Sequence, residues 1–259
     1  MQVVRGLRRL AGDAGRLFVV VGVFDGIHRG HSYLLGQLRR HAGRRAARPT
    51  VITFDAHPDE VLVGEAPPLI CDPDERLMRL SAAGVDVTVI EHFNQALRMT
   101  PYDGFIRMIT ERTPLVGLLM TPEAAFGHER RGTPDALSEL GAREGFEVVV
   151  VPSFTLEGVP VSSSAVRSAI AGGDLEAAAH LLGRPYALVG EAGEGRGAGR
   201  VTFSLPVALP PDGDYPVDIR PFPARGSSGS IRWAARIASG VVDIDPEAHG
   251  RVRVEFRSE

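Results

Sequence analysis

The chain has 259 residues, 44% of them apolar, which is enough to bury one large hydrophobic core or two modest ones, so we expect a soluble globular protein. Its net charge of −3 lacks the clustered positive excess that nucleic acids and anionic membranes attract, and we predict neither as a partner. All 29 basic residues are arginine, which excludes a P-loop phosphotransferase and Schiff-base chemistry because both require a lysine.

Short apolar runs alternate with amphipathic stretches through the first two-thirds of the chain, which is typical of βα units around a parallel sheet. The predicted strands lie near 17–23, 50–54, 86–90, 115–120 and 147–151. The predicted helices lie near 30–43, 73–83, 101–111, 133–144 and 162–171, the last capped by Ser162 or Ser163. We therefore predict an α/β fold with a doubly wound parallel sheet. Its ligands should bind at the carboxyl ends of the strands, beside Gly22.

The pattern of residues changes after a short predicted helix at 174–182: glycine, proline and serine become frequent and helical periodicity ends. Short β-like runs at 187–190, 215–219, 231–237 and 251–256 are separated by Pro-Asp-Gly and Gly-Ser-Ser-Gly turns. This pattern predicts a second, smaller antiparallel β-barrel. The predicted domains are 1–185 and 186–259.

Cys71 is the only cysteine, so an internal disulfide and a cysteine-based metal cluster are excluded. A reducing, cytoplasmic location is the prediction. No apolar stretch approaches the roughly 20 residues that span a bilayer, and the N-terminal apolar run lacks the features of a signal peptide.

The most informative motif runs from Gly22 to His31 and reads Gly-Val-Phe-Asp-Gly-Ile-His-Arg-Gly-His. It places two imidazoles, His28 and His31, where a strand leads into a helix. Backbone N–H groups at a helix start attract phosphate, and Gly26 and Gly30 leave the main chain open to it. The alternative is a strand-to-helix turn with structurally satisfied histidines.

Two further segments could contribute to the same site. Ser162, Ser163 and Ser164 open a helix that carries Arg167 one turn later, and this pattern suits the phosphates of a nucleotide. The alternative there is an N-cap followed by a surface arginine. Residues 53–58, including Phe54 and His57, follow the second strand, where a strand end broken by proline is an equally good interpretation. Alternating glycines at 193–199 resemble a dinucleotide-binding loop, but no strong helix follows, so we discount them.

These motifs together resemble the bacterial bifunctional riboflavin kinase/FMN adenylyltransferase (FAD synthetase) family over most of the chain. The resemblance rests on the following segments, which occur in the family's order and spacing: residues 3–7, Gly22 to His31, 53–54 with His57 and Pro58, 161–164 with Arg167, and 181–186.

The resemblance implies an enzyme that transfers AMP from ATP to FMN with Mg²⁺, giving FAD and pyrophosphate. Region 1–185 would be the adenylyltransferase and region 186–259 a kinase-like β domain. The implied catalytic residues are His28, His31 and Arg167. The implied nucleotide-binding residues are Gly22, Phe24, Asp25, Gly30, Ser162, Ser163 and Ser164. The implied flavin-binding residues are Phe54, His57, Pro58 and Glu123, and no residue is assigned to a protein-bound metal.

The sequence departs from the family pattern in two places. In the loop 121–127, Ala124 replaces an aromatic residue and Glu123 replaces a shorter polar one, which predicts a reshaped acceptor pocket. In the kinase half, Thr202 survives, but the magnesium-binding asparagine and the catalytic glutamate are replaced by Ser204 and Ala238. A methyl group cannot accept a proton from riboflavin, so we predict that kinase activity is lost.

Two other functions stay open: nucleotidyl transfer to a different phosphorylated metabolite, and a non-catalytic flavin- or nucleotide-binding regulator. The oligomeric state is not predicted.

Overall fold

The computed structural model describes residues 1–193, 199–223, 230–245 and 247–257. Contacts divide these residues into two units. The sheet unit comprises Met1–Phe24, Gly30–Pro67 and Leu77–Thr155, and the barrel unit comprises the described residues of Asp25–Arg29, Pro68–Arg76 and Leu156–Glu259. The two short segments 25–29 and 68–76 therefore group with the C-terminal part of the chain. The domain boundary near residue 185 stays a prediction.

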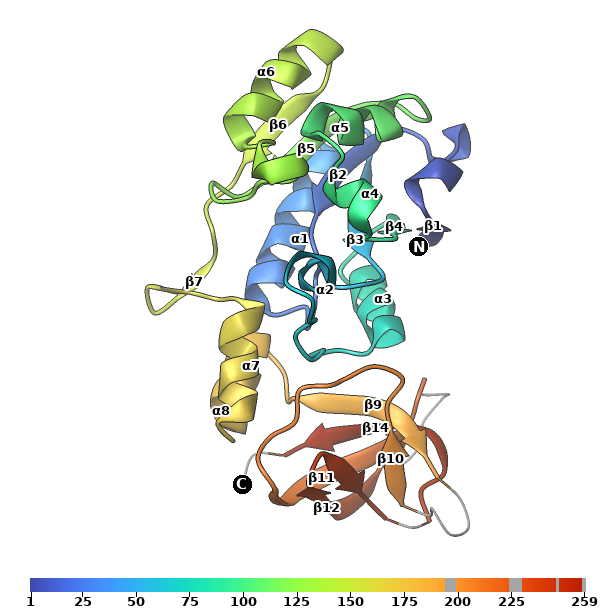
Figure 1. Ribbon diagram of the computed structural model, residues 1–259, viewed down its shortest axis with the longest axis vertical. Helices are drawn as coiled ribbons and strands as arrows, with labels where there is room; N and C mark the ends of the chain where they lie inside the picture. Colours follow the sequence, from blue (N-terminus) through green and yellow to red (C-terminus); the bar gives the residue numbers. More distant parts are fainter. Residues whose placement is uncertain (194–198, 224–229, 246, 258–259) are drawn as a thin grey trace. The chain divides into compact units, whose positions relative to one another are not determined.

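The sheet unit is built on a parallel sheet with the order β1-β4-β3-β2-β5-β6 (Figure 1). Chain order reverses beside β2, which pairs with β3 on one side and β5 on the other. The strands are β1 Gln2–Arg5, β2 Leu17–Val21, β3 Arg48–Phe54, β4 Val87–Glu91, β5 Leu115–Met120 and β6 Glu147–Val150. The helices and short 3-10 turns are η1 Leu7–Arg9, η2 Gly12–Ala14, α1 Arg29–Gly43, α2 Pro58–Leu62, α3 Pro73–Ala82, α4 Gln95–Arg98, α5 Tyr102–Thr110, η3 His128–Arg130 and α6 Pro134–Glu144.

Helices cover both faces of this sheet because successive side chains of a strand point to opposite faces. Leu17 and Val19 of β2 share a core cluster with buried residues of α5 and α6. Phe18, between them, stacks on His41 of α1, with ring centroids 6.1 Å apart. The doubly wound α/β class predicted from the sequence is confirmed.

In the barrel unit, the described strands close into an antiparallel barrel with the order β10-β13-β12-β11-β14-β9. Its interior is filled by apolar side chains such as Val217, Ala235 and Val254, each 0% exposed. The strands are β9 Ala187–Ala192, β10 Arg200–Thr202, β11 Gly213–Pro221, β12 Ile231–Ala238, β13 Val241–Asp243 and β14 Gly250–Phe256. The predicted second, barrel-like fold is confirmed.

The barrel follows two helices, α7 Ser163–Ala171 and α8 Leu175–Leu182, and a short hairpin of β7 Thr155–Leu156 and β8 Val159–Pro160. Two predicted features, most of the glycine run at 193–199 and the turn at 226–229, lie outside the described residues. In the described part of the chain, none of the helices combines the length and the apolarity that crossing a bilayer requires.

Candidate active site

The loop between β2 and α1 has an uncommon backbone conformation. Phe24, Gly26 and Ile27 have positive φ values of 55°, 80° and 41°, which L-residues other than glycine rarely adopt. A Cβ atom on Gly26 would also lie only 2.9 Å from Cγ2 of Ile70. Gly26 is therefore required by its own backbone angle and by the close approach of Ile70.

The carboxylate of Asp25 anchors this loop within the barrel unit. Asp25 is 1% exposed, and its two oxygens accept hydrogen bonds from the Ile70 amide at 3.1 and 3.0 Å. The Cys71 amide donates a further bond of 3.1 Å, and Nη2 of Arg167 lies 2.7 Å from the same carboxylate. A buried carboxylate needs such partners, since an unpaired one would be strongly destabilising.

The start of α7 meets the same loop. The hydroxyl of Ser162 accepts a hydrogen bond of 3.2 Å from the Ala165 amide, so Ser162 is the N-cap. The hydroxyl of Ser163 donates to the backbone carbonyl of Asp25 at 3.1 Å, and Nε of Arg167 donates to the Pro68 carbonyl at 2.8 Å. The barrel unit thus brings together Asp25, Ser163 and Arg167, which are far apart in the sequence.

His28 lies in the same unit and is 4% exposed. Burial, together with the positive charges of Arg184 and Arg167, lowers its pKa from 6.5 to about 4. His28 is therefore a neutral imidazole at pH 7.

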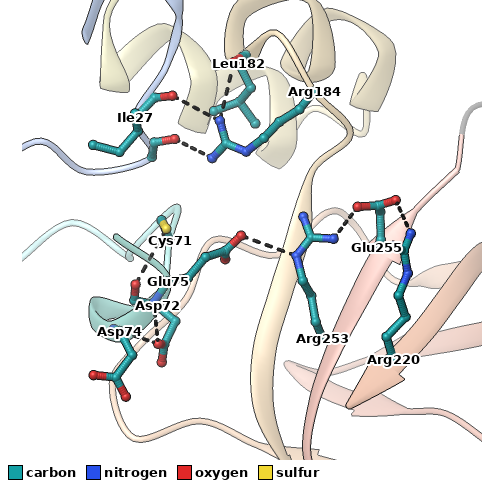
Figure 2. A network of polar contacts seen from close by, with 11 residues as sticks. Ile27, Cys71, Asp72, Asp74, Glu75, Leu182, Arg184, Arg220, Arg253 and Glu255 are labelled. Carbon is teal, nitrogen blue, oxygen red and sulfur yellow. Dashed lines mark hydrogen bonds and ion pairs between the residues drawn. The ribbon is translucent and has the colours of Figure 1, made fainter. Parts of the chain in front are cut away.

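Arg184 binds two consecutive backbone carbonyls of the loop between β2 and α1. Its guanidinium donates to the carbonyl oxygens of Gly26 and Ile27, the latter at 3.0 Å, as Figure 2 shows for Ile27. Arg184 belongs to the segment 181–186 of the family resemblance, but no role was predicted for it. Its contact to the loop depends on tertiary structure and has no local sequence signal.

His31 belongs to the sheet unit, in the first turn of α1, and is partly buried. Its ring lies against that of Phe24, with centroids 4.9 Å apart. Gly22 makes room for this aromatic ring, since a Cβ there would lie 3.1 Å from Cε2 of Phe24. Gly30 is the second residue of α1, and Ser164 is exposed in the first turn of α7.

A cavity of about 580 Å³ opens in the sheet unit, next to the ends of β2 and β3. Its lining is mostly apolar and aromatic. Its polar and charged side chains come from Arg98 and from the segment 128–130. Phe54 meets Phe93 edge to face at 5.3 Å, and Phe105 lies 5.2 Å from Phe126. The lining residues are Val21, Gly22, Val23, Phe54, Pro58, Leu62, Phe93, Leu97, Arg98, Phe105, Ala125, Phe126, Gly127, His128, Glu129 and Arg130.

The predicted flavin-binding residues divide between this cavity and its surroundings. Phe54 and Pro58 line it. His57 caps α2, accepting a hydrogen bond of 3.2 Å from the Asp59 amide. Glu123 is at the surface, where a hydrogen bond from the Ser153 hydroxyl at 2.8 Å is the main cause that lowers the pKa of its carboxyl. Ala124 packs against the core of the sheet unit.

Comparisons with known proteins show the family of the chain. The model of the FAD synthetase family matches residues 12–165. The chain belongs to the FAD synthetase family. It is 32% identical to a bifunctional riboflavin kinase/FMN adenylyltransferase of Pseudomonas fluorescens, over 76% of this chain and 63% of that protein. It is 31% identical to the protein of the same name from Haemophilus influenzae, over 80% of this chain and 68% of that protein.

The fold of this FAD synthetase family member also occurs in a solved structure. It resembles a crystal structure described as a macrolide-efflux protein from Streptococcus pneumoniae, with a TM-score of 0.78 and 23% sequence identity. The superposition includes 98% of this chain and 88% of the other. This similarity concerns the fold alone.

Several side chains of the cavity, including Phe93, Arg98 and Phe105, were not predicted because they lie on segments without a recognised motif.

Proposed function

We propose that the chain is an FMN adenylyltransferase, which transfers AMP from ATP to FMN and releases pyrophosphate. The observation that carries the proposal is the convergence of His28, Ser163 and Arg167 around the loop anchored by Asp25. Donors fixed before the substrate arrives can stabilise charge that develops on a phosphate without further rearrangement.

In the proposed reaction, an oxygen of the FMN phosphate attacks the α-phosphorus of ATP. A new P–O bond forms as the bond from the α-phosphorus to the oxygen bridging to the β-phosphorus breaks, and pyrophosphate leaves. The FMN phosphate is already an anion at neutral pH, so no general base is needed. Catalysis then consists of in-line positioning and charge stabilisation.

His28, His31 and Arg167 would contribute as donors to the phosphates. A neutral His28 donates one N–H, and its low pKa keeps the imidazole uncharged at neutral pH. Arg167 already has Nε and Nη2 bound to protein, so its guanidinium is fixed in one orientation. Gly22, Phe24 and Asp25 would shape the nucleotide site, with Ser162, Ser163 and Ser164 at the pyrophosphate end.

The cavity of the sheet unit suits the isoalloxazine of FMN, because its aromatic side chains offer stacking surfaces to a planar ring system. Val23 of its lining is only two residues before Asp25 in the chain. Phe54 and Pro58 would contact the flavin, with His57 and Glu123 acting nearby.

We expect Mg²⁺ to enter bound to the phosphates of ATP, where it would neutralise negative charge. Such ions take few ligands from protein and several from phosphate and water. Within the described residues there is no group of three or more His, Cys, Asp and Glu placed to hold a metal ion.

We also propose that riboflavin kinase activity is absent. Ser204 and Ala238 stand where the family resemblance places an asparagine and a glutamate, and Ala238 ends strand β12. The hydroxyl of Thr202 donates to the Glu191 carbonyl at 3.3 Å.

A different phosphorylated acceptor is the second candidate, favoured by Glu123 and Ala124 in the loop 121–127.

A single assay separates these functions. The purified protein is incubated with ATP, Mg²⁺ and either FMN or riboflavin, and both FAD and pyrophosphate are measured. We expect FAD from FMN and no product from riboflavin. Turnover of riboflavin would refute the proposed loss of kinase activity. Pyrophosphate released only with another phosphorylated metabolite would favour the second candidate, and tight ATP binding without turnover would favour a regulator.

A further inference from the structure

The segment 68–76 is bound to the barrel by main-chain hydrogen bonds. The Leu69 amide donates to the Pro206 carbonyl at 2.8 Å, and the Ala208 amide donates to the Leu69 carbonyl at 2.8 Å. Leu69 and Val207 thereby form a parallel β-bridge. The segment is therefore an addition to the barrel, although it precedes the barrel's first strand by more than a hundred residues.

Two arginines of strand β14 hold the next part of the same segment, where α3 begins. Arg251 lies 2.8 Å from the carboxylate of Asp72 and 2.6 Å from that of Asp74. Arg253 lies 3.3 Å from the carboxylate of Glu75, which is 5% exposed. The Arg253 and Glu75 side chains are only 16% and 7% exposed, and a charge-assisted contact at that depth is stronger than a surface ion pair.

Arg253 is itself fixed within the barrel. It also contacts Glu255 on its own strand, and Glu255 accepts a hydrogen bond of 3.0 Å from Arg220 of β11 (Figure 2). Burial alone would lower the pKa of Arg253, but its contacts with Glu255 and Glu75 outweigh that effect and raise the pKa. This arginine therefore stays charged and keeps one geometry.

Between these two attachments, the segment presents the amides of Ile70 and Cys71 to the carboxylate of Asp25. Residues of the barrel thus hold the segment, and the segment holds the loop that carries His28. The loop needs such support, because Ile27, a β-branched residue, has a positive φ of 41°.

We propose that the barrel serves as the scaffold of the adenylyl-transfer site, and that Arg251 and Arg253 are positioning residues that act through the segment 68–76 on Asp25 and His28. This inference rests on the proposed function for its catalytic consequence. It gives the barrel a role that does not depend on kinase activity.

The variant that tests the proposal is Arg251→Ala in the full chain. The side chain of Arg251 is 31% exposed, and after its loss the Asp72 carboxylate would keep its hydrogen bonds from the Asp74 and Glu75 amides. Arg253 and Glu75 are only 16% and 7% exposed, so removal of Arg253 would disturb a more deeply buried ion pair. Arg236→Ala is the matched control. Arg236 forms a 2.8 Å ion pair with Asp214 between two barrel strands and does not contact the segment.

Two measurements are made on wild type, Arg251→Ala, Arg251→Lys and Arg236→Ala: amide hydrogen exchange over 22–30 and 66–76, and the kcat and KM values with ATP and FMN. For Arg251→Ala we expect exchange at Ile70 and Cys71 to rise on the order of 10-fold and kcat to fall on the order of 10-fold. The KM for FMN should change little. Arg251→Lys should recover part of kcat, and Arg236→Ala should match wild type.

The proposal would be overturned if Arg251→Ala had the same amide exchange and kcat as wild type. It would also be overturned if Arg236→Ala lost as much kcat and protection as Arg251→Ala. If wild type makes no FAD from FMN, the proposed function fails. The exchange measurement then still decides whether the barrel holds the loop, since it requires no turnover.

Discussion

At the scale of single residues, the environment of His28 determines its chemistry. A histidine in water has a pKa near 6.5 and is partly protonated at neutral pH. Here burial and two neighbouring arginines lower the pKa to about 4. The sequence shows an imidazole beside glycine, but only the folded protein makes it a neutral donor.

This shift predicts a pH dependence of stability. An imidazole whose pKa is lowered by folding contributes stability that is complete above pH 6.5 and is lost as the pH falls toward 4. Protonation of His28 should therefore reduce the free energy of unfolding by about 3 kcal/mol between pH 7 and 4. Urea unfolding of wild type and His28→Asn at several pH values measures it. Identical pH slopes for the two proteins would contradict the prediction.

His31 should affect turnover much more than stability. It is partly buried against Phe24, and the proposed mechanism gives its ring a role in binding phosphate during transfer. We expect His31→Ala to lower kcat by on the order of 10²-fold or more, with little change in melting temperature. Steady-state kinetics and thermal unfolding on the same preparation test this. A full rate in the variant would remove His31 from the phosphate site.

At the scale of elements, the loop from Phe126 to Gly132 is fitted against the start of α5. The Phe126 and Gly132 main chains pair with each other, and a Cβ on Gly132 would lie 2.6 Å from Cβ of Tyr102. A Cβ on Gly127 would lie 2.6 Å from the Tyr102 amide nitrogen. Because Gly127 and residues 128–130 line the cavity, this close packing determines the shape of its wall.

Gly127→Ala should therefore impair the acceptor site. Its φ of +76° disfavours any side chain, and the added methyl would collide with main-chain atoms of α5. We expect the KM for FMN to rise on the order of 10-fold while the KM for ATP changes little. The control is Gly145→Ala, which has a similar φ of +85° but open space around its Cβ. Equal effects in both variants would show that the change is general destabilisation.

Most regular elements were predictable from the sequence because their patterns are local. The alternation at 187–190 and 251–256 and the periodicity at 133–144 correspond to β9, β14 and α6. The shortest elements, β1, α2 and α4 among them, were not predicted, since four or five residues carry too little periodicity. Strand β1 is held by pairing with β4, a contact distant in sequence.

The candidate site was predictable only in part. The histidines, the Ser162 cap and Arg167 belong to motifs, and the structure brings Ser163 and Arg167 to the loop at Asp25. The supports of that loop, Ile70, Cys71 and Arg184, were not predicted. Ile70 and Cys71 act through their backbone amides. Every residue except proline has such an amide, so the residue type does not reveal this role.

At the scale of the whole molecule, the chain order and the contact units differ. Segments 25–29 and 68–76 lie in the first third of the sequence but group with the barrel. Each is short and enters the barrel unit through specific contacts, such as the Asp25 and Arg167 pair. The loop between β2 and α1 is therefore held by residues that are synthesised much later in the chain.

The sequence by itself determined the βα order, the second antiparallel domain and the family, because these depend on local periodicity and on motifs of fixed spacing. Tertiary structure alone decided that His28 is neutral, that an aromatic cavity forms beside β2 and β3, and that β14 holds the segment next to Asp25. Burial, charge proximity and the pairing of distant backbone groups arise only when remote parts of the chain meet, and no local pattern records them.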